Sequence, residues 1–397
     1  MANADTLPHQ LLNDQHAVDL VMKMMAIPGK SGDEGPIAEF IVGQLKQAGV
    51  DDASIRFDSA NRKSRIGGDV GNLIVKLPGT KRGPRRLLMA HIDTVPLCVG
   101  CKPVRSGDII RSSDPTTALG GDDRAGAAVI LNTLKLLREH NLEHPPLTFL
   151  WTVQEEIGLV GARNVAIGKL GKPKLCFNWD GGVPNLAVIG ATGDDHLEIE
   201  ITGLASHAGA HPEMGISAIA IASRAISSLV EDGWFGLIRK GKNSGTSNIG
   251  VISGGAATNV VTDQLLLKGE VRSHDPKFRA RIVKEYERAF RKAAKEIKNA
   301  EGETGSVRFE ASAKYEAFRL DPKHEVVQAA EQGISQAGLK METRISNGGL
   351  DANWMNAHGL PTVTLGCGQN QIHTVKEELH VPSFLHACRI AAAIATA

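Results

Sequence analysis

The chain has 397 residues, of which 42% are hydrophobic and 22% are charged. This composition is typical of a globular protein, and the length predicts two domains or one domain with a large insertion. Lysine and arginine number 45 against 44 aspartates and glutamates, so the charge balance does not favour a nucleic-acid partner or an anionic membrane surface. No run of about 18 apolar residues could span a bilayer, and the first residues lack the pattern of a signal peptide, so we expect neither.

The cysteines indicate a reducing compartment. There are five of them, an odd number spread along the chain, which does not suggest a disulfide framework, and we expect a cytoplasmic protein. Cys98 and Cys101 form a CxxC pair, which can be half of a zinc site or a redox pair. No second CxxC accompanies it and no thioredoxin-type helix follows it, so we interpret the two as structural loop cysteines.

The first part of the chain alternates predicted helices and strands. An acidic start at Asp33 predicts a helix to Leu45, and apolar residues at helical spacing predict another over 127–137. Near-continuous apolar runs, typical of a mainly parallel sheet covered by helices, predict buried strands. These runs are Leu73–Leu77, Leu87–Ala90, Leu147–Val153 and Leu175–Trp179.

The pattern changes at about residue 195. The next predicted elements follow the order βαββαβ of a ferredoxin-like layer, at 196–201, 215–230, 248–253, 265–271, 276–297 and 307–318. Residues 241–245 are predicted to be a short flexible loop. A helix over 325–336, a strand over 361–366 and a C-terminal helix from Val381 then resume the first pattern. We therefore predict an α/β domain built from residues 1–194 and 316–397, with an inserted lid domain over 195–315.

Five polar clusters lie where predicted strands end or where a helix begins. They are His91-Ile92-Asp93, Asp122-Asp123, Glu155-Glu156, Asp180 and His373. Alone, each has an ordinary interpretation as an exposed histidine, a helix cap, a solvated loop or a turn. Ligand sites of open α/β sheets lie beyond the carboxyl ends of the strands, so their joint occurrence there favours one common site.

The residue types in these clusters are those of a two-metal site. Imidazole and carboxylate ligands suit zinc, cobalt or manganese, and the lack of thiolates argues against a closed structural zinc site. Two histidines and three carboxylates suffice for two divalent ions if one carboxylate bridges them. Asp93 is the expected partner that orients His91. One residue of the pair Glu155-Glu156 would bind metal, and the other would then be the general base.

The motifs HID at 91–93, GGDDRAG at 120–126, EEIGL at 155–159 and WDGG at 179–182, with the late His373, resemble those of the M20 metallopeptidase family. The resemblance covers nearly the whole chain, including the lid. It implies that His91 and Asp180 bind one ion and that Glu156 and His373 bind the other. It further implies Asp122 as the bridging ligand, Asp93 as the residue that orients His91, and Glu155 as the general base.

The resemblance extends to substrate-binding residues in the lid. His207, within GLASHAG, would reach an active site and help to polarise the scissile carbonyl; the alternative is a polar residue at a strand end. Asn259 and Arg272 would hold the substrate. An arginine fork suits a substrate carboxylate, although a surface salt bridge is the alternative for Arg272. Residues 348–353 resemble a family loop near the site, and we expect no catalytic role for Asp351.

Within the family, the segments GGDDRAG, SGGAATNVV, NGGLDANWMNAHG and QIHT most resemble peptidase T-like proteins. The resemblance implies a hydrolase that uses two divalent ions, zinc first and cobalt or manganese otherwise. Its substrates would be short peptides, above all tripeptides, from which it releases the N-terminal residue. A deacylase of N-acyl amino acids or a dipeptidase is the nearest alternative, and a non-catalytic metal-binding or assembly protein is the alternative from another class. A lid of this kind pairs two subunits in some members, so a homodimer through the lid stays open.

Overall fold

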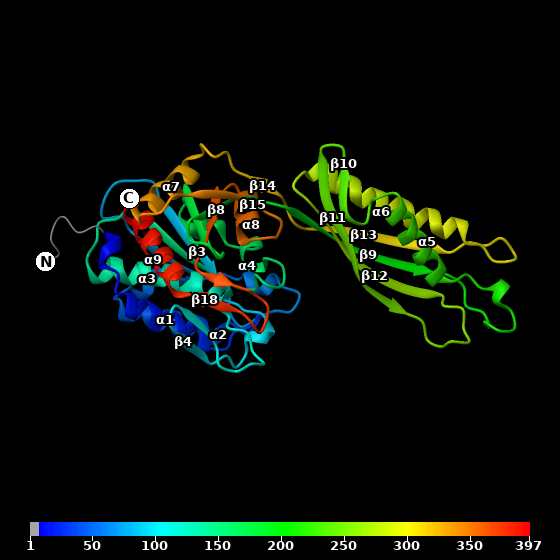
Figure 1. Ribbon diagram of the computed structural model, residues 1–397, viewed down its shortest axis with the longest axis horizontal. Coiled ribbons are helices and arrows are strands. Elements are labelled where there is room, and N and C mark those ends of the chain that lie inside the picture. The colour runs from blue at the N-terminus through cyan, green and yellow to red at the C-terminus, as the bar shows by residue number, and fades with distance from the viewer. Residues whose placement is uncertain (1–7) are drawn as a thin grey trace. The chain divides into compact units, whose positions relative to one another are not determined.

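The computed structural model describes residues 8–397, which fall into two units (Figure 1). Unit 1 comprises the described residues up to Ala191 together with Arg319–Ala397, and unit 2 comprises Thr192–Phe318. Both units combine helices with a sheet, so the predicted α/β class with an inserted ferredoxin-like unit is confirmed. Among the described residues, no helix has the length and apolar character needed to cross a membrane.

A nine-stranded sheet forms the centre of unit 1, in the order β1-β2-β6-β3-β7-β16-β8-β14, with β15 paired to β8. Its middle strands β6, β3, β7 and β16 are parallel to one another, whereas β2 and β8 join them antiparallel. The strands are β1 (Ile55–Phe57), β2 (Leu73–Leu77), β3 (Arg86–His91), β6 (Leu147–Thr152), β7 (Leu175–Trp179), β8 (Leu186–Ala191), β14 (Phe318–Arg319), β15 (Glu342–Ser346) and β16 (Thr362–Leu365).

The parallel strands are buried along their whole length, which explains their continuous apolar runs. Because they run in the same direction, their carboxyl ends meet at one edge of the sheet. His91, Thr152, Trp179 and Leu365 are the last residues of the four strands, so the segments that follow them begin side by side. This edge is where the sequence places most of its polar clusters.

Helices cover the sheet, as Figure 1 shows for α3, α9 and α7. The longest of unit 1, α3, is buried along nearly all of its length and packs against α1 and α9. The helices are α1 (Asp14–Ala26), α2 (Gly35–Gln47), α3 (Gly121–Glu139), α4 (Val160–Arg163), α7 (Glu325–Gln336), α8 (Asp351–Ala357) and α9 (Val381–Thr396). Three of these, α1, α4 and α8, were not predicted. Residues 348–353 are a loop only as far as Leu350, because α8 begins at Asp351 and the Asn353 side chain accepts a hydrogen bond from Leu350 N.

A second sheet of unit 1 has four short strands, in the order β17-β18-β5-β4. They are β4 (Pro103–Ser106), β5 (Ile109–Ser112), β17 (Gln369–Asn370) and β18 (Glu378–His380). The antiparallel pair β17 and β18 flanks the loop that carries His373. Pairing of β18 with β5 ties this loop to a hairpin more than 250 residues earlier, since Glu378 lies opposite Arg111. The sequence did not predict this sheet, because its strands are too short to carry a pattern.

Unit 2 is an antiparallel sheet in the order β10-β11-β12-β9-β13 with two helices on one face (Figure 1). Its elements are β9 (Gly193–Thr202), α5 (Ala218–Glu231), β10 (Gly236–Lys240), β11 (Asn243–Gly254), β12 (Gln264–Ser273), α6 (Pro276–Glu296) and β13 (Ser306–Tyr315). Without β10, the strand order and the crossings are those of a ferredoxin-like layer. Apolar residues of both helices and of β9 and β12 form its core.

Two predictions for unit 2 were wrong in detail. The segment 241–245 is not a flexible loop: it is the turn and start of a hairpin in which Lys240 pairs with Asn243, and Gly241 provides the positive φ of 62°. The helix predicted from residue 215 starts later, because the Ser217 side chain accepts a hydrogen bond from Ala220 N and caps α5 at Ala218.

Candidate metal centre

The structure brings the five predicted metal ligands together in unit 1. They lie at or just beyond the ends of four strands or in the first turn of α3, and they are His91, Asp122, Glu156, Asp180 and His373. Ligand atoms of His91, Asp122 and Asp180 all lie within 4.8 Å of one another. Ligand atoms of Asp122, Glu156 and His373 do the same. Asp122 therefore belongs to both groups.

The two oxygens of Asp122 face different histidines. Oδ1 lies 3.2 Å from Nε2 of His91, and Oδ2 lies 3.2 Å from Nε2 of His373. The same nitrogen of His373 is 2.9 Å from Oε2 of Glu156. A carboxylate with one oxygen toward each ligand group has the arrangement that a bridging ligand between two ions requires.

Asp93 is fully buried and supports both sides of this arrangement. Its Oδ1 lies 3.3 Å from Nδ1 of His91 and accepts a hydrogen bond of 2.9 Å from Glu155 N. Its Oδ2 accepts hydrogen bonds from Ser31 Oγ at 2.6 Å and from Glu156 N at 3.2 Å. One carboxylate thus sets the ring orientation of His91 and the position of the turn that carries both glutamates.

The two adjacent glutamates differ in their surroundings. The Glu156 carboxylate contacts His373, whereas no contact of the Glu155 carboxylate to either histidine is found among the described residues. Glu155 lines the same hollow as Asp122 and Asp180. Burial raises the pKa of Glu155 well above its usual value, and the carboxylates of Asp180 and Asp351 add to the rise.

The charges of the cluster fit two divalent cations. Burial raises the pKa of Asp180 well above its usual value, and the neighbouring Asp122 carboxylate raises it further. Hydrogen bonds to Asp122 and Glu156 raise the pKa of His373 to about 10. Both shifts arise because buried carboxylates outnumber the imidazoles beside them, and divalent cations suit such an arrangement of charge. Nitrogen and oxygen donors without a thiolate are the ligands that zinc, cobalt and manganese accept.

Residues 87–397 match the sequence model of Peptidase family M20/M25/M40. The chain belongs to this family. It is 32% identical over 388 residues to the uncharacterized protein YqjE of Bacillus subtilis strain 168. The aligned region covers 97% of this chain and 98% of that protein.

Two solved structures are similar over almost the whole chain. A tripeptidase from Staphylococcus aureus superposes with a TM-score of 0.88 at 30% identity, covering 97% of this chain and 98% of that one. The aminopeptidase PepT from Bacillus cereus superposes with a TM-score of 0.84 at 31% identity, and the match covers 97% of this chain and 99% of that one. These findings confirm the prediction of a peptidase T-like metallopeptidase of the M20 family.

Two buried residues that the sequence did not single out hold the centre of this M20 peptidase. Gln369 donates from Nε2 to Asp122 Oδ1 at 3.3 Å and to Asp180 Oδ1 at 3.2 Å. Glu377 accepts from Asp122 N at 3.0 Å and from Gly120 N at 2.8 Å, which fixes the turn before α3. Gln369 precedes the QIHT motif at 371–374 and lies outside every motif named above, and Glu377 lies 255 positions from Asp122, so no spacing could reveal either.

Asp351 lies near the centre without joining either ligand group. It is 1% exposed and accepts a hydrogen bond from Thr152 Oγ1 at the end of β6. Burial raises the pKa of Asp351 to about 6. Its carboxylate thus contributes to the negative potential around Glu155 and Asp180 rather than to the ligand set.

The three predicted substrate-binding residues all lie in unit 2. His207 and Asn259 belong to two exposed segments that pair with each other: Ala208 N donates to Asn259 O at 2.9 Å, and His207 forms a bridge with Val260. Nδ1 of His207 accepts a hydrogen bond from Ala210 N at 3.0 Å. The structure therefore brings His207 and Asn259 together.

Arg272 lies elsewhere in unit 2. In β12 it pairs with Asp194, whereas Gln264, at the end of β12 nearer to Asn259, pairs with Thr202. Eight residues of antiparallel strand span about 27 Å. The Arg272 guanidinium donates to Glu270 at 2.9 Å and lies 3.7 Å from Asp194. The structure therefore does not bring Arg272 together with the other two, and the ion pair that was its alternative interpretation is present.

The metal centre opens into a hollow of about 470 Å³ within unit 1. Asp122, Glu155, Glu156, Asp180 and His373 form its polar side. Its lining also includes the aliphatic residues Val183, Leu186, Val188 and Leu365, and Arg344 as a cationic group. The hollow therefore combines the candidate ligands with apolar lining residues.

Proposed function

We propose that this M20 peptidase is a two-metal aminopeptidase that releases the N-terminal residue of short peptides, tripeptides above all. The observation that carries the two-metal assignment is Asp122, with one oxygen 3.2 Å from His91 and the other 3.2 Å from His373. The likeness to a tripeptidase and to an aminopeptidase PepT, each at 30% identity or more over almost the whole chain, supports the substrate assignment.

In this proposal, His91 and Asp180 bind one ion, Glu156 and His373 bind the other, and Asp122 bridges them. Zinc is the first choice of metal, with cobalt or manganese as alternatives. The bound ions would polarise the scissile carbonyl and lower the pKa of the attacking water. Residues 1–194 and 316–397 form the catalytic domain, and residues 195–315 form the lid, which carries His207, Asn259 and Arg272.

Glu155 is the general base. Its carboxylate makes no direct contact with either histidine among the described residues, it lines the hollow, and its backbone is held by Asp93. A carboxylate with a raised pKa can accept a proton from the attacking water and then deliver it to the leaving amine. Asp93 acts as a positioning residue, since it contacts His91 and the backbone of both glutamates.

A panel of peptides that differ in length and in blocked ends tests the proposal. We expect hydrolysis of tripeptides with a free amino group, no hydrolysis after N-acetylation, and loss of activity with EDTA that added zinc, cobalt or manganese restores. Activity confined to N-acetyl amino acids would instead establish a deacylase. Failure of the purified protein to bind any divalent ion would exclude the metal centre itself.

Glu155→Gln tests the assignment of the base. The substitution keeps the size and removes the proton acceptor, so turnover should fall by at least ~10²-fold while two ions per chain are retained. Metal content measured by elemental analysis is the second readout. Retention of activity with full metal content would contradict the role of Glu155.

A further inference from the structure

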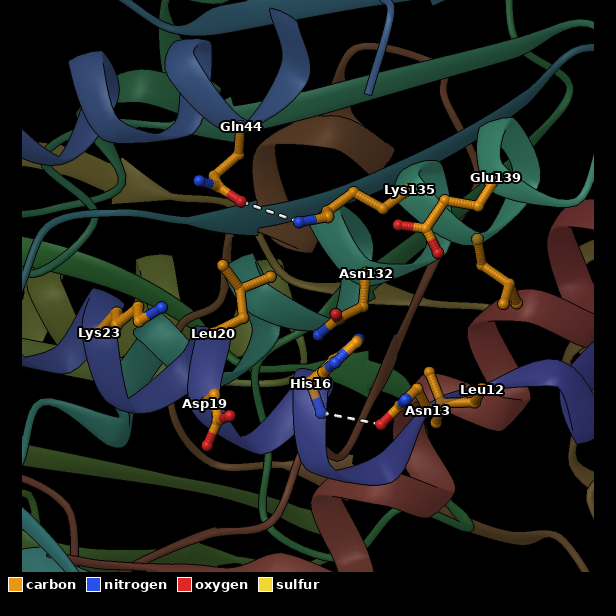
Figure 2. Close-up of a pocket in the computed structure, with 11 residues that line it drawn as sticks. Leu12, Asn13, His16, Asp19, Leu20, Lys23, Gln44, Asn132, Lys135 and Glu139 are labelled. Carbon is orange, nitrogen blue, oxygen red and sulfur yellow. Dashed lines mark hydrogen bonds between the residues drawn. The ribbon is translucent and has the colours of Figure 1, made fainter. Parts of the chain in front are cut away.

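Unit 1 contains a second hollow, of about 220 Å³, between α1, α2 and α3 (Figure 2). Its volume is far above what one water molecule requires. It shares no lining residue with the hollow at the metal centre. It is lined by Leu12, Asn13, His16, Asp19, Leu20, Lys23, Gln44, Asn132, Lys135, Leu136 and Glu139.

Asn132 gives this hollow a buried donor that has no strong acceptor among the described residues. The residue is 7% exposed, and its Nδ2 has no hydrogen-bond partner among the described residues. Burial raises the pKa of the Cys388 thiol, and the nearby Asn132 side chain acts against that rise, but a thiol is a weak acceptor. Figure 2 shows the Asn132 side chain extending from α3 toward the α1 side of the hollow, where His16 lies. Such an amide is expected to have a partner, and a ligand in the hollow can provide one.

Charged groups of both signs line the same hollow. Lys135 donates to Gln44 Oε1 at 2.8 Å, which holds its ammonium group at the hollow (Figure 2), and Lys23 adds a second cation. Glu139 and Asp19 supply carboxylates, of which Asp19 accepts a hydrogen bond from Gln15 at 2.7 Å. A simple anion or a simple cation would meet like charge on one side. A molecule that carries both charges would not.

The remaining lining is aliphatic. Leu20 and Leu136 are 6% and 4% exposed, so their side chains form an apolar floor rather than a solvated rim. A ligand that fits all three features has a carboxylate for Asn132 and the lysines, an ammonium group for the carboxylates, and an apolar side chain for the leucines.

We propose that this hollow is a second ligand site, separate from the metal centre, and that it binds a free α-amino acid with an apolar side chain. A peptidase releases molecules of this class, so the interpretation of the ligand as a reaction product rests on the proposed function. Binding of the amino acid does not depend on that function. Asn132 lies on α3, which also carries Asp122 in its first turn. The helical part of α3 follows directly after Asp122 and Asp123, so product bound here would contact the helix that leads away from the metal centre.

Calorimetric titration of the metal-loaded enzyme with L-methionine tests the binding. We expect a component that persists after EDTA removes the metals, because the hollow has no metal ligand. Asn132→Leu, of similar size but without the donor, should weaken this component at least tenfold. Lys135→Met should weaken it as well, and because Lys135 is only half-buried this variant carries the test if Asn132→Leu does not fold. Lys63→Met, at an exposed lysine outside the hollow, is the matched control and should have no effect.

Crystals grown with L-selenomethionine locate the site, since selenium gives an anomalous signal. A selenium peak among Asn132, Lys135 and Leu20 is expected. A peak at the metal centre alone, binding at crystal concentration only, or a calorimetric component unchanged in both variants would each overturn the proposal. No turnover is measured, so absence of peptidase activity would leave this result intact, and loss of amino-acid binding would leave the proposed function intact.

Discussion

Replacing Gln369 with leucine tests whether residues beyond the ligands set metal affinity. The wild-type amide donates to Asp122 Oδ1 at 3.3 Å and to Asp180 Oδ1 at 3.2 Å, and both carboxylates belong to the group that contains His91. Hydrogen bonds to charged acceptors contribute about 1.5–3 kcal/mol each. An ion that binds the same carboxylates neutralises part of their charge and weakens these hydrogen bonds. The sum of the two hydrogen-bond energies is therefore an upper bound on the loss of metal-binding free energy. We therefore expect a 10–100-fold loss of affinity for the ion of this group, or about 1.4–2.7 kcal/mol.

Competition with a chromophoric zinc chelator measures the two affinities separately. In Gln369→Leu, the loss should fall mainly on one ion, because Glu156 and His373 have no hydrogen bond to Gln369 among the described residues. Gln336→Leu makes the same substitution at an exposed position on α7 and should leave both affinities unchanged. Equal weakening of both ions, or no weakening of either, would refute the reasoning from these contacts.

Three further substitutions test other parts of the structure. Asp93→Asn replaces two acceptor oxygens by one and should lower metal affinity about 10–100-fold. Competition with a zinc chelator measures this affinity, and an unchanged value would contradict the role of Asp93. Glu34 is fully buried, and burial followed by repulsion from Asp93 raises its pKa from 4.5 to about 7. The folded, metal-free protein therefore holds a proton that the unfolded chain releases, and stability is lost as pH rises from about 5 to 8. Urea unfolding over this pH range should give Glu34→Gln a higher free energy of unfolding than wild type, by a margin that grows with pH to roughly 3 kcal/mol. If the free energies of unfolding of the two proteins changed in parallel with pH, Glu34 would not titrate in this range. Tyr286 donates to Ser247 Oγ at 2.8 Å in the core of unit 2, so Tyr286→Phe should reduce unfolding free energy by about 1 kcal/mol in urea, and an unchanged midpoint would contradict this.

The sequence predicts the centre of unit 1 well because burial on both faces leaves little choice of residue. Leu147–Thr152 and Leu175–Trp179 are buried throughout, so each is a continuous apolar run that ends at a polar cluster. The parallel direction of these strands then brings the clusters to one edge. Five ligand candidates could be named on this basis without knowing which strands are neighbours.

Gln369 and Glu377, which support the ligands, escape prediction because their partners are far apart in the chain. Glu377 contacts the backbone of Asp122, 255 positions away, and its own neighbours in sequence carry no pattern. The three lid residues were predicted together because the family resemblance gives them a common role. A common role does not require that residues lie next to one another. The register of β12 puts Arg272 beside Asp194 and leaves His207 with Asn259 at the other end of unit 2.

Asp93 explains why the candidate base and a candidate ligand can occupy adjacent positions. The backbone N–H groups of Glu155 and Glu156 donate to its two different oxygens, at 2.9 and 3.2 Å. Because one rigid carboxylate holds both amides, the turn cannot rotate, and the two side chains must point in different directions from a fixed backbone. The same oxygens contact His91 Nδ1 at 3.3 Å and Ser31 Oγ at 2.6 Å, so Asp93 has no free acceptor through which it could reorient. A single buried aspartate therefore ties the histidine of one ligand group to the glutamate of the other, and any change at Asp93 should disturb both groups together.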